Sequence, residues 1–150
     1  MRRLVVIGLI FLTLSVSGQE ECPRNRKWWV IGGETAGVAV GSVLLYQLWF
    51  DDHNTGKFRF FNDNPEWLGM DKVGHFYSAY QLSYGGFGLM EWSCIERRKA
   101  MWIGAGQGFG LLLILETMDG FSEGWGFSWG DVLANGLGTG LMVGQELAWG

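Results

Sequence analysis

The segment MDKVGHFYSAYQ, residues 70–81, places polar side chains at the start of an otherwise apolar and aromatic stretch. Asp71 and His75 are four positions apart, so a helix would present them on one face, with Ser78 following on the same face. A histidine held by a carboxylate can act as an oriented general base. We therefore expect Asp71 and His75 to be catalytic, with Lys72 beside them binding a substrate or a cation.

Two other apolar segments also carry a polar pair at one end. Glu116 and Asp119 come near the end of one segment, and Asp131 and Asn135 come at the start of the next. In a bundle whose helices alternate in direction, these pairs meet His75 on one side. Ionisable groups inside apolar helices are rare and usually functional. The pattern predicts that all four residues bind a substrate or a cation.

Each polar residue also has a local structural explanation. Asp71 can cap the start of its helix. Ser128 and Asp131 match the S-x-x-D form of a capping box, and Asp119 followed by Gly120 is typical of a helix end. An internal ion pair can also serve only to fix how helices pack. The sequence leaves both interpretations open.

The chemistry of the set stays undecided between several classes. One histidine with several carboxylates can bind a divalent cation, so such a cofactor is allowed, although the metal itself is unknown. The doubled Glu-x-x-His pattern of di-iron bundles is absent. No nucleophile elbow surrounds a serine, and GAGQGFG at 104–110 follows no strand, so it indicates helix packing. Whether the protein is an enzyme is not determined.

The composition indicates helices packed in or against a membrane. The chain has 150 residues, enough for one domain, with 48% hydrophobic, 17% charged and 25 glycine residues. Few charges and many small residues favour close helix contacts in an apolar setting. The formal net charge of −4 offers no basic face, so we expect no nucleic-acid partner.

Four apolar segments predict an all-α fold, a small bundle of about four main helices that is membrane-embedded or membrane-associated. They cover residues 28–50, 71–94, 100–118 and 129–149. A short helix at 66–70 is expected after Asn64 and Pro65, which form a helix-start signal. Glu34, the only charge in the first segment, faces either a polar interior or solvent.

Glycines four positions apart predict faces that helices, or further copies of the chain, approach closely. They stand at positions 37 and 41, and at 136, 140 and 144. Alternate glycines at 104, 106, 108 and 110 suggest another close helix contact.

The N-terminal residues 1–18 have the layout of a signal peptide, which leaves 19–150 as a single helical domain. Export would place Cys22 and Cys94 in an oxidising compartment, where they can pair. Two acidic residues precede Cys22 where a lipobox needs small apolar ones, so lipidation there is not expected.

The distribution of basic residues conflicts with a cleaved signal peptide. The motifs PRNRK and ERRK would lie on the cytoplasmic side of four membrane spans, whereas cleavage would leave residue 19 outside. A bundle attached to the membrane surface avoids the conflict. We expect an exported protein, located in the inner membrane or on the periplasmic membrane surface.

Two long blocks, FFNDNPEWLGMDKVGHFYSAYQLS and ETMDGFSEGWGFSWGDVLANGLGTG, resemble the uncharacterised YfiM-type family of predicted periplasmic lipoproteins. The resemblance covers about residues 58–149 and implies an envelope location without an activity. A more distant similarity is to VanZ-like membrane proteins, which are associated with glycopeptide resistance. The residues that carry it are Asp71, Lys72, His75, Glu116, Asp131, Asn135 and Gly138. The Gln and Arg that usually follow the Glu in VanZ-like proteins are missing here.

These observations predict an exported bacterial envelope protein with a polar site in a helical bundle. It would bind or act on a membrane lipid headgroup or a cell-wall component. Two alternatives stay open, a non-enzymatic envelope scaffold and a small ion-binding or permeation protein.

Overall fold

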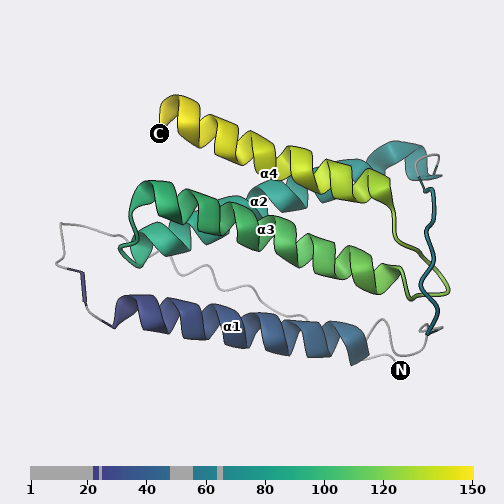
Figure 1. Cartoon of the computed structure of the whole chain (residues 1–150), viewed down its shortest axis with the longest axis horizontal. Coiled ribbons are helices and arrows are strands. Elements are labelled where there is room, and N and C mark those ends of the chain that lie inside the picture. The colour runs from purple at the N-terminus through teal and green to yellow at the C-terminus, as the bar shows by residue number, and fades with distance from the viewer. Residues whose placement is uncertain (1–21, 24, 48–55, 64–65) are drawn as a thin grey trace, which may run out of the picture.

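The computed structural model describes residues 22–23, 25–47, 56–63 and 66–150. Figure 1 shows four helices in these ranges, with a single 3-10 turn before the second. They are α1 (Arg26–Leu45), η3 (Glu66–Gly69), α2 (Met70–Trp92), α3 (Arg97–Asp119) and α4 (Trp129–Trp149). No strand occurs among the described residues, so the predicted all-α bundle is confirmed. The expected signal peptide and the helix-start signal at Asn64 and Pro65 fall outside these ranges.

Helices α2, α3 and α4 alternate in direction and form one packed unit (Figure 1). The start of α2, the end of α3 and the start of α4 therefore share one end of the bundle. At the opposite end lies the apolar core, where α2, α3 and α4 meet. Its buried members are Val30, Phe87, Met90, Ala100, Met101, Ala105, Met142 and Val143. Burying such side chains stabilises the bundle, which leaves the other end free to carry polar groups.

Three glycines allow the helices of this unit to approach closely. A Cβ at Gly104 would overlap the backbone at Phe87, and one at Gly108 would overlap Ser83. A Cβ at Gly138 on α4 would overlap the carbonyl oxygen of Phe76 on α2. Small residues at these positions bring helix backbones together.

The other glycines that were predicted to lie in close helix contacts do not make them. A Cβ would meet nothing within 4 Å at positions 37, 41, 106, 110, 140 and 144. At Gly136 it would meet only Phe109, at 3.8 Å. The predicted stripe at 136, 140 and 144 is therefore wrong as a contact face inside the chain. The buried face of α4 instead follows Ala134, Asn135, Gly138 and Met142.

Helix α1 lies beside this unit and buries only Val30. A disulfide between Cys22 and Cys94 ties its start to the turn between α2 and α3, which confirms the predicted pairing. Along the helix, Nε2 of Gln107 donates a hydrogen bond to Oε2 of Glu34 at 2.7 Å. Glu34 is half-buried and faces α3, rather than being fully solvated.

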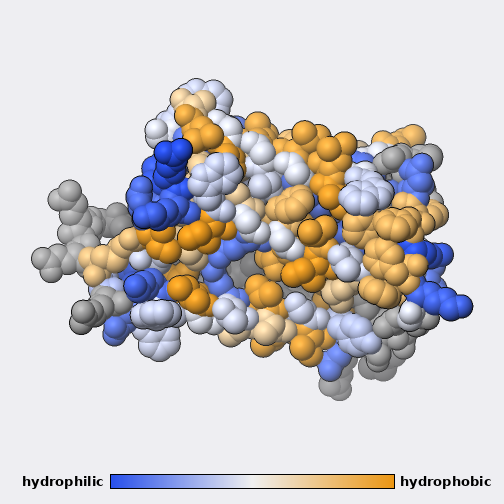
Figure 2. Space-filling view, viewed as in Figure 1, coloured by the Kyte–Doolittle hydropathy of each residue, from blue (hydrophilic) through white to orange (hydrophobic). Residues whose placement is uncertain are grey.

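Large hydrophobic side chains cover much of the exterior. Figure 2 shows them across the face in view, with hydrophilic residues gathered mostly towards its two ends. By length and hydropathy, α1 and α3 could each cross a membrane. The same test is passed by core helices of soluble proteins and by signal sequences.

Two loops cover the polar end of the bundle. Residues 56–63 run beside the loop from α3 to α4, with Phe60 and Phe127 forming a parallel bridge. The amide of Phe61 donates to the carbonyl of Phe127 at 2.9 Å, and the amide of Phe127 donates to Arg59 at 3.0 Å. Aromatic rings then pack across the junction. Phe58, Phe60, Phe121, Phe127 and Trp129 contact one another there.

Candidate functional site

The polar residues of α2 lie at its start, and the helix begins one residue before Asp71. The helix starts at Met70 after Gly69, whose φ of 74° is in the left-handed region that favours glycine. Asp71 therefore lies in the first turn, and the suggestion that it caps the helix is wrong. One turn later, His75 is half-buried, with 21% of its side chain exposed.

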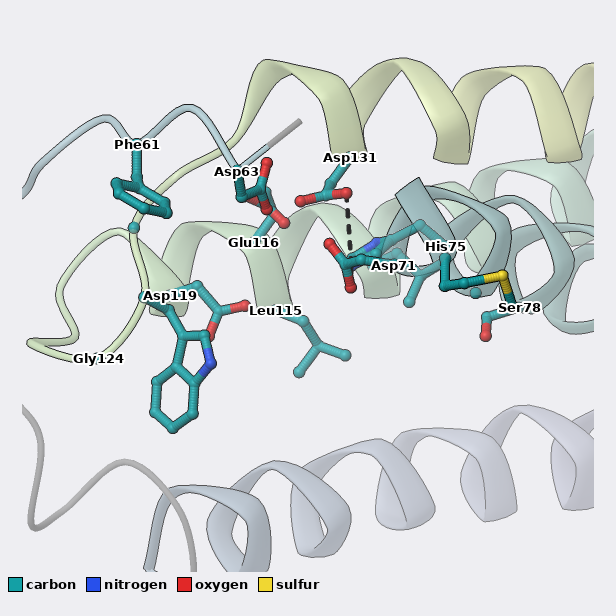
Figure 3. A pocket seen from close by; sticks show the side chains of 15 residues that line it. Phe61, Asp63, Asp71, His75, Ser78, Leu115, Glu116, Asp119, Gly124 and Asp131 are labelled. Atoms are coloured by element: carbon teal, nitrogen blue, oxygen red, sulfur yellow. Dashed lines mark ion pairs between the residues drawn. The ribbon is translucent and has the colours of Figure 1, made fainter. Parts of the chain in front are cut away.

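The polar groups of α2 and α4 meet at His75. Its Nε2 lies 3.8 Å from Oδ1 of Asp71 and 3.8 Å from Oδ1 of Asp131. Figure 3 shows Asp71 and His75 on α2 facing Asp131 on α4. The structure thus brings together the pairs that the sequence placed at the ends of separate helices.

Glu116 and Asp119 join this group from the end of α3, because they line the same cavity (Figure 3). The cavity has a volume of about 860 Å³ and opens at the polar end of the bundle. Its lining comes from all three helices and both loops. The residues are Phe61, Asp63, Met70, Asp71, Gly74, His75, Ser78, Leu112, Leu115, Glu116, Asp119, Gly124, Trp125, Gly126 and Asp131.

Lys72 lies behind this lining and holds three carboxylates. Its Nζ is 2.6 Å from Asp63, 3.1 Å from Asp71 and 2.7 Å from Asp131. Burial acts to lower the pKa of Lys72, but the hydrogen bonds to Asp131 and Asp63 outweigh it and raise the pKa. The ammonium is therefore charged throughout the physiological range and is bound internally, not displayed to a ligand.

Asp63 is the member that the sequence analysis missed. Its Oδ1 accepts hydrogen bonds from Lys72 and from Oγ of Ser128, both at 2.6 Å. Burial acts to raise the pKa of Asp63, but these hydrogen bonds lower it to about 2. The only available signal was its place in a polar stretch before α2, which is typical of any loop.

Asp131 has a structural role as well as a place in the site. Oγ of Ser128 accepts from the amide of Asp131 at 3.3 Å, so the predicted cap at the start of α4 is confirmed. The amide of Ser128 donates to Oε1 of Glu116, which fastens α4 to α3. The carboxylate of Asp131 is 4% exposed, and burial raises its pKa.

The two acids of α3 are held in a poorly hydrated and negative environment. Burial raises the pKa of Glu116 to about 8, and the charges of Asp131 and Asp119 act in the same direction. Burial also raises the pKa of Asp119, to about 6, against the effect of His75. At neutral pH, Glu116 is therefore mostly protonated and Asp119 mostly ionised.

Asn135 orients His75 from behind. The asparagine is fully buried, and its Oδ1 lies 3.2 Å from Nδ1 of His75. An amide oxygen only accepts, so Nδ1 of His75 donates in this hydrogen bond, while Nε2 faces the two carboxylates. Asn135 and Lys72 do not line the cavity. They contact side chains that do line it, Asn135 that of His75 and Lys72 those of Asp63, Asp71 and Asp131, and their binding of a substrate or cation stays a prediction.

The arrangement defines a small all-α bundle with an acidic pocket at one end. The chain belongs to a family described as predicted periplasmic lipoprotein (DUF2279), whose model matches residues 59–145. That range contains the whole pocket. No curated protein and no solved structure matches the chain, so the more distant VanZ-like resemblance has no support.

The family description agrees with an exported envelope protein and adds no activity. Its lipoprotein element does not suit Cys22 in this structure. Sγ of Cys22 is bonded to Cys94, and a sulfur in a disulfide cannot also carry a thioether-linked lipid.

Proposed function

We propose that the protein is an exported envelope protein whose pocket binds the polar group of a lipid or of a cell-wall component. One observation supports this above the others, which is the acidic cavity with a histidine in its wall. Five carboxylic side chains line it, from Asp63, Asp71, Glu116, Asp119 and Asp131. Perturbed ionisable groups in a concave site are typical of binding and active sites.

The lining indicates the charge of the group that binds. Lys72 neutralises part of the negative charge, but Asp119 faces the cavity without a salt bridge among the described residues. An ammonium group would fit beside Asp119, and Phe61 and Trp125 offer aromatic rings in the same cavity. Both a zwitterionic lipid headgroup and a cell-wall stem peptide carry such an amino group.

His75 has the features of a proton acceptor in this site. Its Nε2 faces the carboxylates of Asp71 and Asp131 and belongs to a ring that lines the cavity. Asn135 fixes the ring through Nδ1. In this proposal His75 accepts a proton or a hydrogen bond from the bound group.

Calorimetric titration of the purified protein tests the binding role. The probes are phosphoethanolamine, for the lipid source, and a peptidoglycan stem peptide with a free amino group, for the cell-wall source. We expect one of them to bind, and Asp119→Asn to weaken it at least tenfold. The matched control is Glu123→Gln, which removes an exposed carboxylate from the loop that follows Asp119. If neither probe binds, the proposal is contradicted.

A structural scaffold is the second candidate, and the ion pairs of Lys72 favour it. They connect the loop before α2 to α2 and α4, as expected of groups that fix how elements pack. This candidate predicts that His75→Gln changes stability and envelope phenotype together. A defect in the envelope with unchanged thermal stability would instead favour the binding role.

The exposed hydrophobic side chains support a location at the membrane surface. They occur on all four helices, for example Trp29, Tyr77, Trp102 and Leu137. Large apolar patches on a protein exterior are typical of protein or membrane contact. Flotation with anionic phospholipid vesicles tests this location, since a protein that does not bind lipid remains at the bottom of the gradient.

A further inference from the structure

We propose that Asp71, His75 and Asp131 bind one divalent transition-metal ion in the wall of the pocket. Each residue offers one ligand atom, and these atoms all lie within 4.8 Å of one another. Two of the residues are one turn apart on α2 and the third comes from α4 (Figure 3). The metal site lies in the pocket of the proposed function. It rests on that function only for the identity of the molecule that would bind to the metal.

The histidine is prepared for this role by its partner on the other side. Asn135, which is fully buried, accepts from Nδ1, and Nε2 faces Oδ1 of Asp71 and of Asp131. Metal-binding histidines almost always donate their other ring nitrogen in this way.

The distances suit a metal after a small movement. Nε2 of His75 is 3.8 Å from each carboxylate oxygen. Ligands about 2.1 Å from one ion lie about 3.0–3.4 Å apart. Each pair with His75 must therefore close by less than about 1 Å, and the two carboxylate oxygens, which lie within 4.8 Å of each other, by less than about 2 Å. The side chain of Asp71 is 43% exposed and can move, whereas Asp131 is held by the start of α4.

The charge balance also leaves room for a cation. Lys72 is one positive charge among the three carboxylates of Asp63, Asp71 and Asp131. Lys72 contacts Oδ2 of Asp71, which leaves Oδ1 for the side of His75. Oδ1 of Asp131 is buried and lies 2.7 Å from Nζ of Lys72, so a metal ion would share this oxygen with the ammonium group. One divalent ion would balance the two negative charges that remain.

The ligand set selects the class of metal. An imidazole with two carboxylates suits Zn²⁺, Mn²⁺ or Fe²⁺ better than Mg²⁺ or Ca²⁺, which prefer oxygen ligands alone. Three protein ligands leave positions open towards the cavity. A phosphate could occupy them while an ammonium group of the same molecule faces Asp119. The site would then recognise both charges of a zwitterionic headgroup.

Titration of metal-free protein with MnCl₂ tests the proposal, with free Mn²⁺ measured by electron paramagnetic resonance and Zn²⁺ as competitor. We expect one ion per chain, displaced by Zn²⁺. His75→Gln and Asp71→Asn should each lower the affinity at least tenfold. Both residues are partly exposed, so the variants should remain folded, which circular dichroism would verify. Glu123→Gln is the control and should bind as the unmodified chain does.

Two results would overturn the inference. One is the absence of stoichiometric binding, and the other is an equal loss of affinity in His75→Gln and in Glu123→Gln, which would indicate general attraction by acidic groups. Because the metal is titrated without any other ligand, a failure of the metal proposal can be distinguished from a failure of the proposed function. Binding of phosphoethanolamine or the stem peptide to metal-free protein would preserve that function even if no metal bound.

Discussion

Nζ of Lys72 lies 2.7 Å from Oδ1 of Asp131, across the contact between α2 and α4. The same ammonium reaches Asp63 in the loop before α2, so one side chain joins three segments of the chain. Since Asp131 is buried, its charge depends on this neighbour. The stability of the polar end and the chemistry of the pocket are therefore linked through Lys72.

Replacing Lys72 with methionine should destabilise the protein strongly at neutral pH. The change leaves three carboxylates close together without their shared cation, and breaking a buried ion pair costs about 3 kcal/mol. Urea unfolding followed by circular dichroism would measure it. The matched control is Lys99→Met, because Lys99 pairs with Glu96 on the exposed surface and should change stability little.

The pH dependence of the stability lost in Lys72→Met provides a second readout. Hydrogen bonds from Lys72 and Ser128 overcome the effect of burial and lower the pKa of Asp63 from 3.8 to about 2. The stability contributed by that carboxylate is therefore lost as the pH falls through that range, and Lys72 supplies part of it. The difference between the unmodified chain and Lys72→Met should therefore shrink below about pH 4. A deficit that is constant with pH would indicate lost packing rather than lost charge.

Glu116→Gln should make the protein more stable at pH 8 and leave it nearly unchanged at pH 5. The folded chain keeps Glu116 protonated up to about pH 8, whereas the unfolded chain loses the proton near 4.5. The free energy of unfolding of the unmodified protein therefore decreases as the pH rises from about 4.5 to about 8. Glutamine does not ionise, so the variant does not show this decrease.

Because glutamine can still accept from Ser128, the helix connection is retained. We expect a stability difference of about 2 kcal/mol at pH 8. If the free energies of unfolding of the two proteins changed by the same amount from pH 5 to pH 8, this account would be contradicted.

The sequence predicted the main elements because apolar periodicity and terminal polar pairs are local signals. Placing Asp71, His75, Glu116 and Asp131 together needed only the alternation of three helices, which the structure confirms. The sequence did not indicate Asp63, because its partners Lys72 and Ser128 are defined by how a loop folds back over the bundle.

The roles of individual polar residues were harder to predict than their positions. Lys72 and Asn135 were expected to contact a ligand, yet they bind the side chains that do line the cavity. A spacing of four residues identifies a shared helix face, but not which atoms point outwards. The same limit applies to the glycines, since Gly138 packs closely and Gly140 does not.

Reduction of the disulfide should release α1 without unfolding the other helices. Helix α1 buries only Val30 and is otherwise tied by the bond between Cys22 and Cys94 and by the contact of Glu34 with Gln107. Hydrogen exchange measured by mass spectrometry should show at least tenfold faster exchange in α1 after reduction, with α2–α4 unchanged. Simultaneous loss of protection in all four helices would show that α1 is an integral part of the core.

Gly138→Ala should destabilise the bundle, whereas Gly136→Ala should not. A Cβ at position 138 would overlap the carbonyl oxygen of Phe76 and press on Ala79, so α4 would have to move away from α2. Overpacking of this kind costs about 1–3 kcal/mol. At position 136 the added methyl group meets only Phe109 at 3.8 Å, an ordinary contact. Alanine there should stabilise α4 by up to about 1 kcal/mol through its higher helix propensity.

The two glycine variants also separate packing from the site. Moving α4 would carry Asp131 away from His75, so Gly138→Ala should weaken Mn²⁺ binding although position 138 lies outside the pocket. Gly136→Ala should leave the metal affinity close to that of the unmodified chain and should not lower the stability. Equal stability of the two variants in urea would show that α2 and α4 are not in the close contact that brings His75 to Asp131.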